Sequence, residues 1–215
     1  MNASKILTIA VAFALLASTL MPIFGVGPVA NAAAEDDMVK IGFLNPSTGP
    51  IAVYAEAFSD AAQIAIDHLN EDSTTHTFEL VEADSGCDGT TAATAAQSLV
   101  DAGVVGIAGA ACSGATLGAM EVAKAAGVPM VSYASTSPAL TSADDGGYMF
   151  RVVPSDAQQG MAMASMAASH GWQNPGIIYM SNDYGAGLAA VVKGAYAMGG
   201  VDMCVDISYA DDNTD

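Results

Sequence analysis

Short apolar segments alternate with amphipathic segments along most of this chain, and this alternation constrains its fold more than any other feature. Between Ala55 and Leu69, apolar residues recur every three or four positions, as they do on one face of a helix. Gly103 and Gly127 follow two such segments, and glycine commonly ends a helix. Parallel strands joined by helices form a sheet with helices on both faces, so the sequence predicts an α/β fold. The expected strands span 39–44, 78–83, 104–108, 129–132, 149–153, 176–180 and 203–209, and the expected helices span 55–69, 90–102, 113–126, 156–170 and 185–198.

The first 34 residues differ from the rest of the chain. Lys5 gives a short positive start, Ile6 to Leu20 is apolar, and Ala30-Asn31-Ala32 has the small residues of a cleavage site. This layout predicts a secretory signal peptide over residues 1–34 and a mature protein in the periplasm or outside the cell. The alternative is an uncleaved membrane anchor, because the apolar character continues to Val29, which is long enough to span a bilayer.

The charge balance excludes two classes of partner. The chain has 23 Asp and Glu against 5 Lys and Arg, a formal net charge of −18. It therefore has no basic stripe to replace the counterions of a nucleic acid or to adsorb to an anionic membrane surface. Hydrophobic residues make up 52% of the chain, which is too much for a disordered acidic protein.

The three cysteines are Cys87, Cys112 and Cys204. They form no CxxC pair, and the histidines fall at no metal-ligand spacing, so the sequence predicts no metal site. In an oxidising compartment Cys87 and Cys112 are plausible disulfide partners, which would leave Cys204 over. Three buried free thiols are the alternative.

Three loops that follow predicted strands are small and polar: 45–50 with the nearby Tyr54, 109–114, and 132–138. Ligands of open parallel sheets bind where such loops meet at the carboxyl ends of the strands. Ser113 offers a hydroxyl and a backbone N–H at the start of a helix, where the helix dipole favours an anion. Any one loop is also consistent with ordinary turn and capping chemistry. Three loops at one sheet edge predict a site for a small zwitterion.

Patterns typical of catalysis and cofactor binding are missing from the sequence. It contains no G-x-S-x-G, no Walker A lysine, and no G-x-G-x-x-G after the first strand. Cys112 has no recognisable histidine partner. We therefore expect neither an enzyme nor a bound cofactor.

Residues 41–50, followed by Tyr54, resemble the opening of the type I periplasmic solute-binding proteins of ABC transporters, and most closely their leucine/isoleucine/valine-binding branch. Further similar segments follow in the order of the family and extend the resemblance from Val39 to the end of the chain. These segments are 84–88, 111–114, 134–141, 150–156 and 183–185.

The resemblance implies two α/β lobes joined by a hinge, with the ligand in the cleft between them. Residues 35–153 would form the first lobe, and 154–215 the hinge crossing and the start of a truncated second lobe. The chain stops just after a predicted strand, which suggests either a small domain with an acidic tail or a fragment, and the resemblance favours the fragment. It also implies that Cys87 and Cys112 are bonded.

The resemblance also implies roles for five residues. Ser113 would bind the α-carboxylate of a ligand through its hydroxyl and N–H. Thr136 would share contacts to the carboxylate and the ammonium, and the Ala134 carbonyl would accept from the ammonium. Tyr54 and Tyr184 would wall the cleft.

The favoured function is a receptor that captures a small amino acid or an amide, with the branched-chain type favoured, and delivers it to a membrane-embedded ABC permease. Binding would use hydrogen bonds and domain closure, without chemistry. The acidic partner that the family uses for the ammonium would follow Asp215. The alternative is a ligand-sensing ectodomain of a signalling receptor, which uses the same fold.

Overall fold

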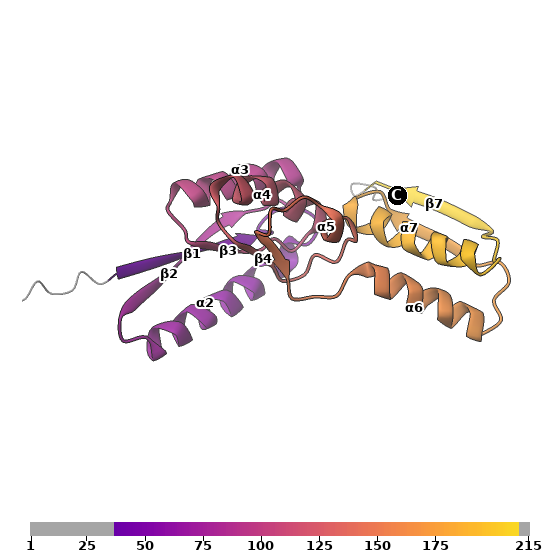
Figure 1. Cartoon of the computed structure of the whole chain (residues 1–215), viewed down its shortest axis with the longest axis horizontal. Helices are drawn as coiled ribbons and strands as arrows, with labels where there is room; N and C mark the ends of the chain where they lie inside the picture. Colours follow the sequence, from indigo (N-terminus) through magenta and orange to yellow (C-terminus); the bar gives the residue numbers. More distant parts are fainter. Residues whose placement is uncertain (1–36, 211–215) are drawn as a thin grey trace, which may run out of the picture. The chain divides into compact units, whose positions relative to one another are not determined.

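The computed structural model of the chain describes residues 37–210, so the predicted signal peptide lies outside the described residues. The strands are β1 (Asp37–Asn45), β2 (His76–Asp84), β3 (Gly106–Ala108), β4 (Met130–Ser132), β5 (Met149–Arg151), β6 (Gly176–Met180) and β7 (Val205–Tyr209). The helices are η1 (Ala52–Tyr54), α2 (Ala55–Asp72), α3 (Gly89–Asp101), α4 (Ser113–Ala126), α5 (Ala139–Ser142), α6 (Asp156–Ser169) and α7 (Asp183–Met198). All strand pairings are parallel, in a five-stranded sheet of order β2-β1-β3-β4-β5 and a two-stranded sheet of β6 and β7 (Figure 1).

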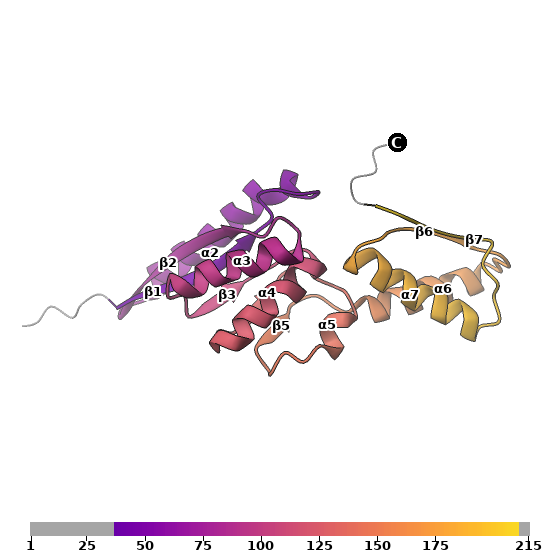
Figure 2. The same ribbon diagram turned by 90° about the horizontal axis from the view of Figure 1, so that it is seen from above.

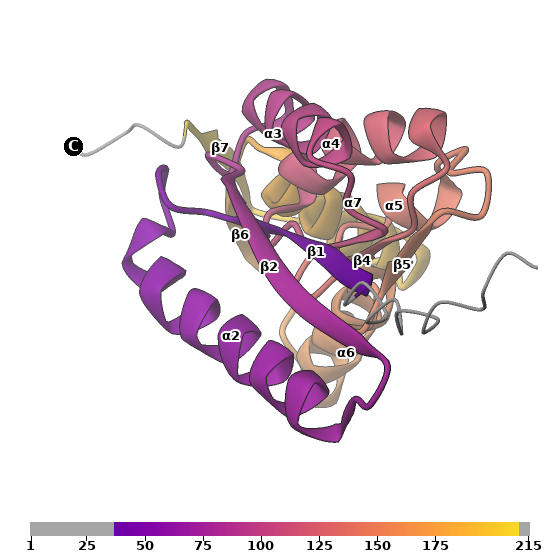
Figure 3. The same ribbon diagram turned by 90° about the vertical axis from the view of Figure 1, so that its left-hand side faces the viewer.

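Helices lie on both faces of the five-stranded sheet. Figures 1 and 3 show α3 and α4 along one face and α2 along the other. The core lies under α3 and α4, where apolar residues on one side of each helix pack onto β1, β3 and β4. Small residues let the two helices approach closely: a Cβ at Gly118 would lie 2.1 Å from the carbonyl oxygen of Gly89. The principal buried side chains there are Leu44, Leu99, Ile107 and Met130.

The β6–β7 sheet has helices on one face only. Figure 2 shows α6 and α7 together on one side of these strands. A small core of Ala167, Val192 and Tyr196 lies between the helices and the sheet. On the other face, Ile178 and its register partner Ile207 are 68% and 52% exposed. This sheet therefore departs from the prediction of helices on both faces.

The α/β class, the parallel pairing and every long helix of the prediction are confirmed. Residues 113–126 form the helix α4 with the predicted bounds, and Gly127 ends it with a φ of 68°. The short elements η1 and α5 were not predicted, because three or four residues show no periodicity. Among residues 37–210, no helix is both long and apolar enough to cross a membrane.

Candidate functional site

A cavity of about 490 Å³ lies where the loops after β1 and β4 meet the first turns of α3, α4 and α7. Its volume falls within the range that small-molecule sites usually have. Pro50 and Ile51 line it from the first loop, and Met180 lines it from the end of β6. It therefore occupies the carboxyl ends of parallel strands, as the sequence predicts.

Four of the five residues proposed for ligand contact line this cavity: Ser113, Ala134, Thr136 and Tyr184. They come from the start of α4, the loop after β4 and the start of α7. Tyr54 is not among the lining residues, and its side chain is 56% exposed. Its ring stacks on that of Phe58 with 6.0 Å between centroids.

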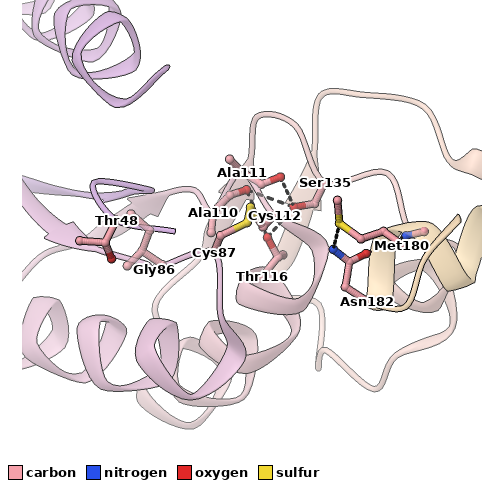
Figure 4. Close-up of a disulfide and its surroundings, with 12 residues drawn as sticks. Thr48, Gly86, Cys87, Ala110, Ala111, Cys112, Thr116, Ser135, Met180 and Asn182 are labelled. Carbon is pink, nitrogen blue, oxygen red and sulfur yellow. Dashed lines mark hydrogen bonds between the residues drawn. A yellow bond between two sulfur atoms is a disulfide. The ribbon is translucent and has the colours of Figure 1, made fainter. Parts of the chain in front are cut away.

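The disulfide between Cys87 and Cys112 also lines the cavity, and it joins the start of α4 to the turn before α3 (Figure 4). The two Cα atoms lie 5.2 Å apart. The pairing is confirmed, and the alternative of three buried free thiols is wrong. Cys204 is free and exposed.

The disulfide leaves α4 without a side-chain cap. Asp88 caps α3 by accepting from the Thr91 N–H at 2.8 Å, and Asn182 caps α7 by accepting from the Gly185 N–H at 2.9 Å. The N-cap of α4 is Cys112, whose sulfur is bonded to Cys87 and makes no capping hydrogen bond. Because the first N–H groups of a helix have no partner within it, this end of α4 favours an anion.

Most hydroxyls of the loop after β4 hold the protein itself together. Ser132 and Ser135 are buried and donate to the Ala110 carbonyl at 2.7 and 3.2 Å. Ser135 also shares a 2.7 Å hydrogen bond with Thr116, as Figure 4 shows. Of the hydroxyl-bearing residues in this loop, Thr136 is the one that lines the cavity.

The hydroxyls of Ser113 and Thr136 have different partners. Ser113 is 2% exposed, and its hydroxyl oxygen accepts from the Ser137 N–H at 3.2 Å. The Thr136 hydroxyl donates to Oδ2 of Asp156 at 2.7 Å. Asp156, which is only 1% exposed, is a residue that the sequence analysis missed. Nothing in the sequence distinguishes it from an ordinary acidic residue in the first turn of a helix.

The charged side chains at the cavity are acidic. Asp88 and Asp183 line it, and no Lys or Arg of the described residues does. The N–H and hydroxyl of Thr91 donate to Asp88 and hold the pKa of its carboxyl below the usual value. Asp183 lies against α4, since a Cβ at Gly114 would be 2.6 Å from its Oδ2. Within residues 37–210, no cluster of three or more His, Cys, Asp or Glu side chains is placed to hold a metal ion.

Comparison with known proteins gives the family. A model of the periplasmic binding protein family matches residues 38–215. The leucine-, isoleucine-, valine-, threonine- and alanine-binding protein of Pseudomonas aeruginosa is 28% identical over 193 residues, which cover 87% of this chain and 51% of that protein. The metabotropic glutamate receptor-like protein E of Dictyostelium discoideum is 32% identical over 157 residues, 73% of this chain and 19% of that protein.

Solved structures agree with these sequence matches. A leucine-binding protein of Thermotoga maritima is 30% identical with a TM-score of 0.70, over 82% of this chain and 50% of that one. A branched-chain amino acid substrate-binding protein of Streptococcus pneumoniae, solved with isoleucine, is 28% identical with a TM-score of 0.72. The match covers 83% of this chain and 51% of that one. The chain spans about half the length of the curated binding proteins that it matches. The match of the family model shows that this chain belongs to the type I periplasmic binding protein family, whose members include the leucine/isoleucine/valine-binding proteins.

Proposed function

We propose that this chain is the ligand-binding part of a receptor that works outside the cytoplasm and captures a small amino acid in the cavity at the starts of α4 and α7. The observation that carries the proposal is the pairing of an uncapped helix start with acidic side chains in one cavity. A zwitterion has a negative and a positive group a few bonds apart, and this cavity supplies a partner for each.

The carboxylate of the ligand binds at the start of α4. The Ser113 hydroxyl uses its oxygen to accept from Ser137, so its hydrogen is free to donate to the ligand. The backbone N–H groups of Ser113 and Gly114 add two further donors without a partner inside the helix. Hydrogen bonds to an ionised group are shorter and stronger than neutral ones, so this end of the cavity holds the carboxylate.

The ammonium binds among the acceptors of the same cavity. Ala134 and Thr136 line it, and Asp88 and Asp183 add negative charge to its walls. A ligand with a carboxylate alone gains nothing from these groups. We therefore favour an amino acid, or a neutral amide that also donates, over a simple organic acid.

The side chain of the ligand lies against the apolar part of the wall. Pro50, Ile51, Met180, Tyr184 and the disulfide supply it. This lining suits a branched-chain side chain, and the named ligands of the matched binding proteins, leucine and isoleucine among them, support that choice.

In this proposal the loaded protein delivers its ligand to a membrane-embedded ABC permease. Residues 35–153 form the first lobe, and 154–215 form the hinge crossing and the start of the second lobe. The predicted signal peptide places the protein in the periplasm or outside the cell. Binding and release involve no covalent step and no cofactor.

A ligand-sensing ectodomain of a signalling receptor is the second candidate. The 32% identity to the receptor-like protein of Dictyostelium discoideum favours it. The full-length gene and its neighbours distinguish the two functions. Neighbouring genes for permease subunits support transport, whereas a membrane span and a signalling domain in the full-length protein support sensing.

The direct test is the substitution Ser113→Ala, with Ser142→Ala as the matched control on the exposed end of α5. Removing a hydrogen bond to a charged group costs roughly 1.5–3 kcal/mol, so the affinity for L-leucine should fall about tenfold to a hundredfold. NMR-monitored titration to millimolar ligand measures the dissociation constants. Equal affinity in Ser113→Ala and the parent protein would show that the Ser113 hydroxyl does not bind the carboxylate.

A further inference from the structure

The end of α6 carries a methionine and a histidine that the packing of the second sheet does not use. Met166 is 50% exposed, and His170, the residue at which the helix ends, is exposed as well. The side chain that this part of α6 buries is Ala167. A single exposed apolar side chain is ordinary. The pairing of a thioether with an imidazole one turn later is the feature that packing leaves unexplained.

The backbone places these two residues on one side of the helix. The His170 N–H donates to the Met166 carbonyl at 3.0 Å, which is the hydrogen bond of an α-helical turn. His170 keeps a right-handed φ of −88° and ψ of −2°. Residues four apart on a helix have Cβ atoms about 5–6 Å apart. Two histidines with this spacing hold a zinc ion in other proteins, so the spacing suits a shared metal ion.

The turn after α6 holds the imidazole in place. Gly171 has a φ of 69°, and this left-handed turn brings Trp172 back so that its N–H donates to the Ala167 carbonyl at 3.0 Å. The Trp172 ring then stacks on the imidazole, with 5.3 Å between centroids and 18° between planes. Stacking covers a face of the imidazole and leaves its two nitrogens open at the edge. Within residues 37–210, no hydrogen bond involves either nitrogen of His170.

The donor atoms select the kind of metal ion. A thioether sulfur and a neutral imidazole nitrogen are uncharged donors, and the thioether is a soft one. Thioethers favour Cu(I), whereas Mg²⁺ and Ca²⁺ take oxygen ligands and structural zinc takes four ligands of which thioethers are not the usual kind. The sequence analysis considered only cysteine and histidine spacings, so a pair of this type lay outside its prediction of no metal site.

We propose that Met166 and His170 bind a Cu(I) ion at the end of α6, with Sδ of Met166 and one ring nitrogen of His170 as its ligands. Trp172 is a positioning residue that orients the imidazole. The site is separate from the amino acid cavity: α6 contributes Gln159 to that cavity, two turns before Met166, and neither proposed ligand lines it. The inference therefore adds a second kind of ligand and does not depend on the proposed function.

The test is an NMR titration of the Cys204→Ala variant with Ag(I), a soft ion that keeps its oxidation state. Cys204 is removed because it is free and exposed, and its thiol would compete for a soft ion. We expect saturable shifts of the Met166 methyl group and the His170 ring with one common dissociation constant. Zn²⁺ in place of Ag(I) should leave the Met166 methyl group unshifted.

Further variants in the same background identify the ligands. Met166→Leu and His170→Gln should each weaken Ag(I) binding at least tenfold, since even outer residues of metal sites contribute that much. The matched control is Met161→Leu: Met161 is 48% exposed on the same helix but lies about 140° around it from Met166, and its loss should change nothing. Trp172→Leu should weaken binding less than the ligand variants and keep the Met166 methyl shift.

Competition with the Cu(I) complex of bicinchoninate, without oxygen, should rank the variants in the same order. Equal Ag(I) affinity in Met166→Leu or His170→Gln and in the Cys204→Ala parent would overturn the proposal. Equal shifts of the exposed Met161 and Met198 methyl groups would also overturn it, because they would show unspecific binding to thioethers. Ag(I) binding without Cu(I) binding would contradict the assignment to copper. L-leucine titrations of the same variants report on the amino acid site separately.

Discussion

Residues 37–151 and residues 156–210 are built from the same kinds of element but bury very different amounts of apolar side chain. In the first region, α3 and α4 pack onto the five-stranded sheet over a continuous core. In the second region, the buried core is small, with Ala167, Val192 and Tyr196 at its centre, and Ile178 and Ile207 lie exposed on the open face of β6 and β7. Burial of apolar surface stabilises the folded state. We therefore expect the first region to have the larger free energy of unfolding and the second to unfold locally more often.

The two regions also differ in what they bring to the cavity. The first supplies Ser113, Ala134 and Thr136, held by the disulfide and by buried hydroxyls. The second supplies Met180, Asp183 and Tyr184 from the less buried sheet and helix. A site between a stable region and a region that unfolds locally more often can admit a ligand and then enclose it.

The largest expected effect comes from placing one methyl group in a helix of each region. A Cβ at Gly118 in α4 would lie 2.1 Å from the backbone of Gly89, whereas a Cβ at Gly194 in α7 meets nothing within 4 Å. Gly118→Ala should cost about 3 kcal/mol or more in the free energy of unfolding, since backbone cannot move aside as a side chain does. Gly194→Ala should instead add about 0.5–1 kcal/mol.

Urea unfolding followed by circular dichroism measures both variants against the parent. Similar small effects at the two positions would contradict the close packing of α3 against α4.

Removing the disulfide should destabilise only the first region. For Cys87 and Cys112, 25 residues apart, the chain-entropy estimate is about 3 kcal/mol. The double variant Cys87→Ala, Cys112→Ala should lose amide protection from hydrogen exchange in residues 37–151 and leave 156–210 as before. Cys204→Ala is the control, because that cysteine is free and exposed. Loss of protection spread evenly over both regions would show that they unfold as one unit.

A smaller effect is expected from removing one helix cap in each region. The stability cost should depend on pH for the cap of the first region and not for the cap of the second. Asp88→Ala in the first region and Asn182→Ala in the second should each cost about 1 kcal/mol near neutral pH. The hydrogen bonds from Thr91 lower the pKa of Asp88 in the folded protein. Its stabilisation is therefore complete above about pH 4, near the unfolded pKa, and is lost as the pH falls through the lower folded value.

The cost of Asp88→Ala should consequently shrink in acid, while the cost of Asn182→Ala, whose amide does not titrate, should persist. Unfolding midpoints of the two variants and the parent, measured near neutral pH and in acid, test this difference. A cost of Asp88→Ala that is independent of pH would mean that the capping carboxylate is not the stabilising form.

The sequence predicts the fold better than it predicts the site. The period of the apolar residues identifies helices such as α4, and the strands are short apolar runs. The start of β3 shifts from residue 104 to Gly106, because strand pairing, which no local pattern encodes, decides where that strand begins. The resemblance to the family predicts ligand contacts at Ser113 and Thr136. The predicted export and the resemblance together predict the disulfide.

Other parts of the site arise only from contacts between distant residues. Asp156 becomes important because the fold places it against Thr136, and Asp183 because it lies beside Gly114. The serines in the loop after β4 look as suited to a ligand as Thr136, yet their hydroxyls are used inside the protein. Sequence shows which residues carry hydroxyls, but not which hydroxyls remain free.

The most direct test of the central claim is an NMR titration of the parent protein with L-leucine, followed at assigned backbone amides. We expect saturable shifts at Ser113, Gly114 and Thr136 in the first region, and at Asp183 and Tyr184 in the second, with one common dissociation constant. Shifts confined to the open face of β6 and β7, or no shifts at millimolar L-leucine, would contradict an amino acid site shared by the two regions.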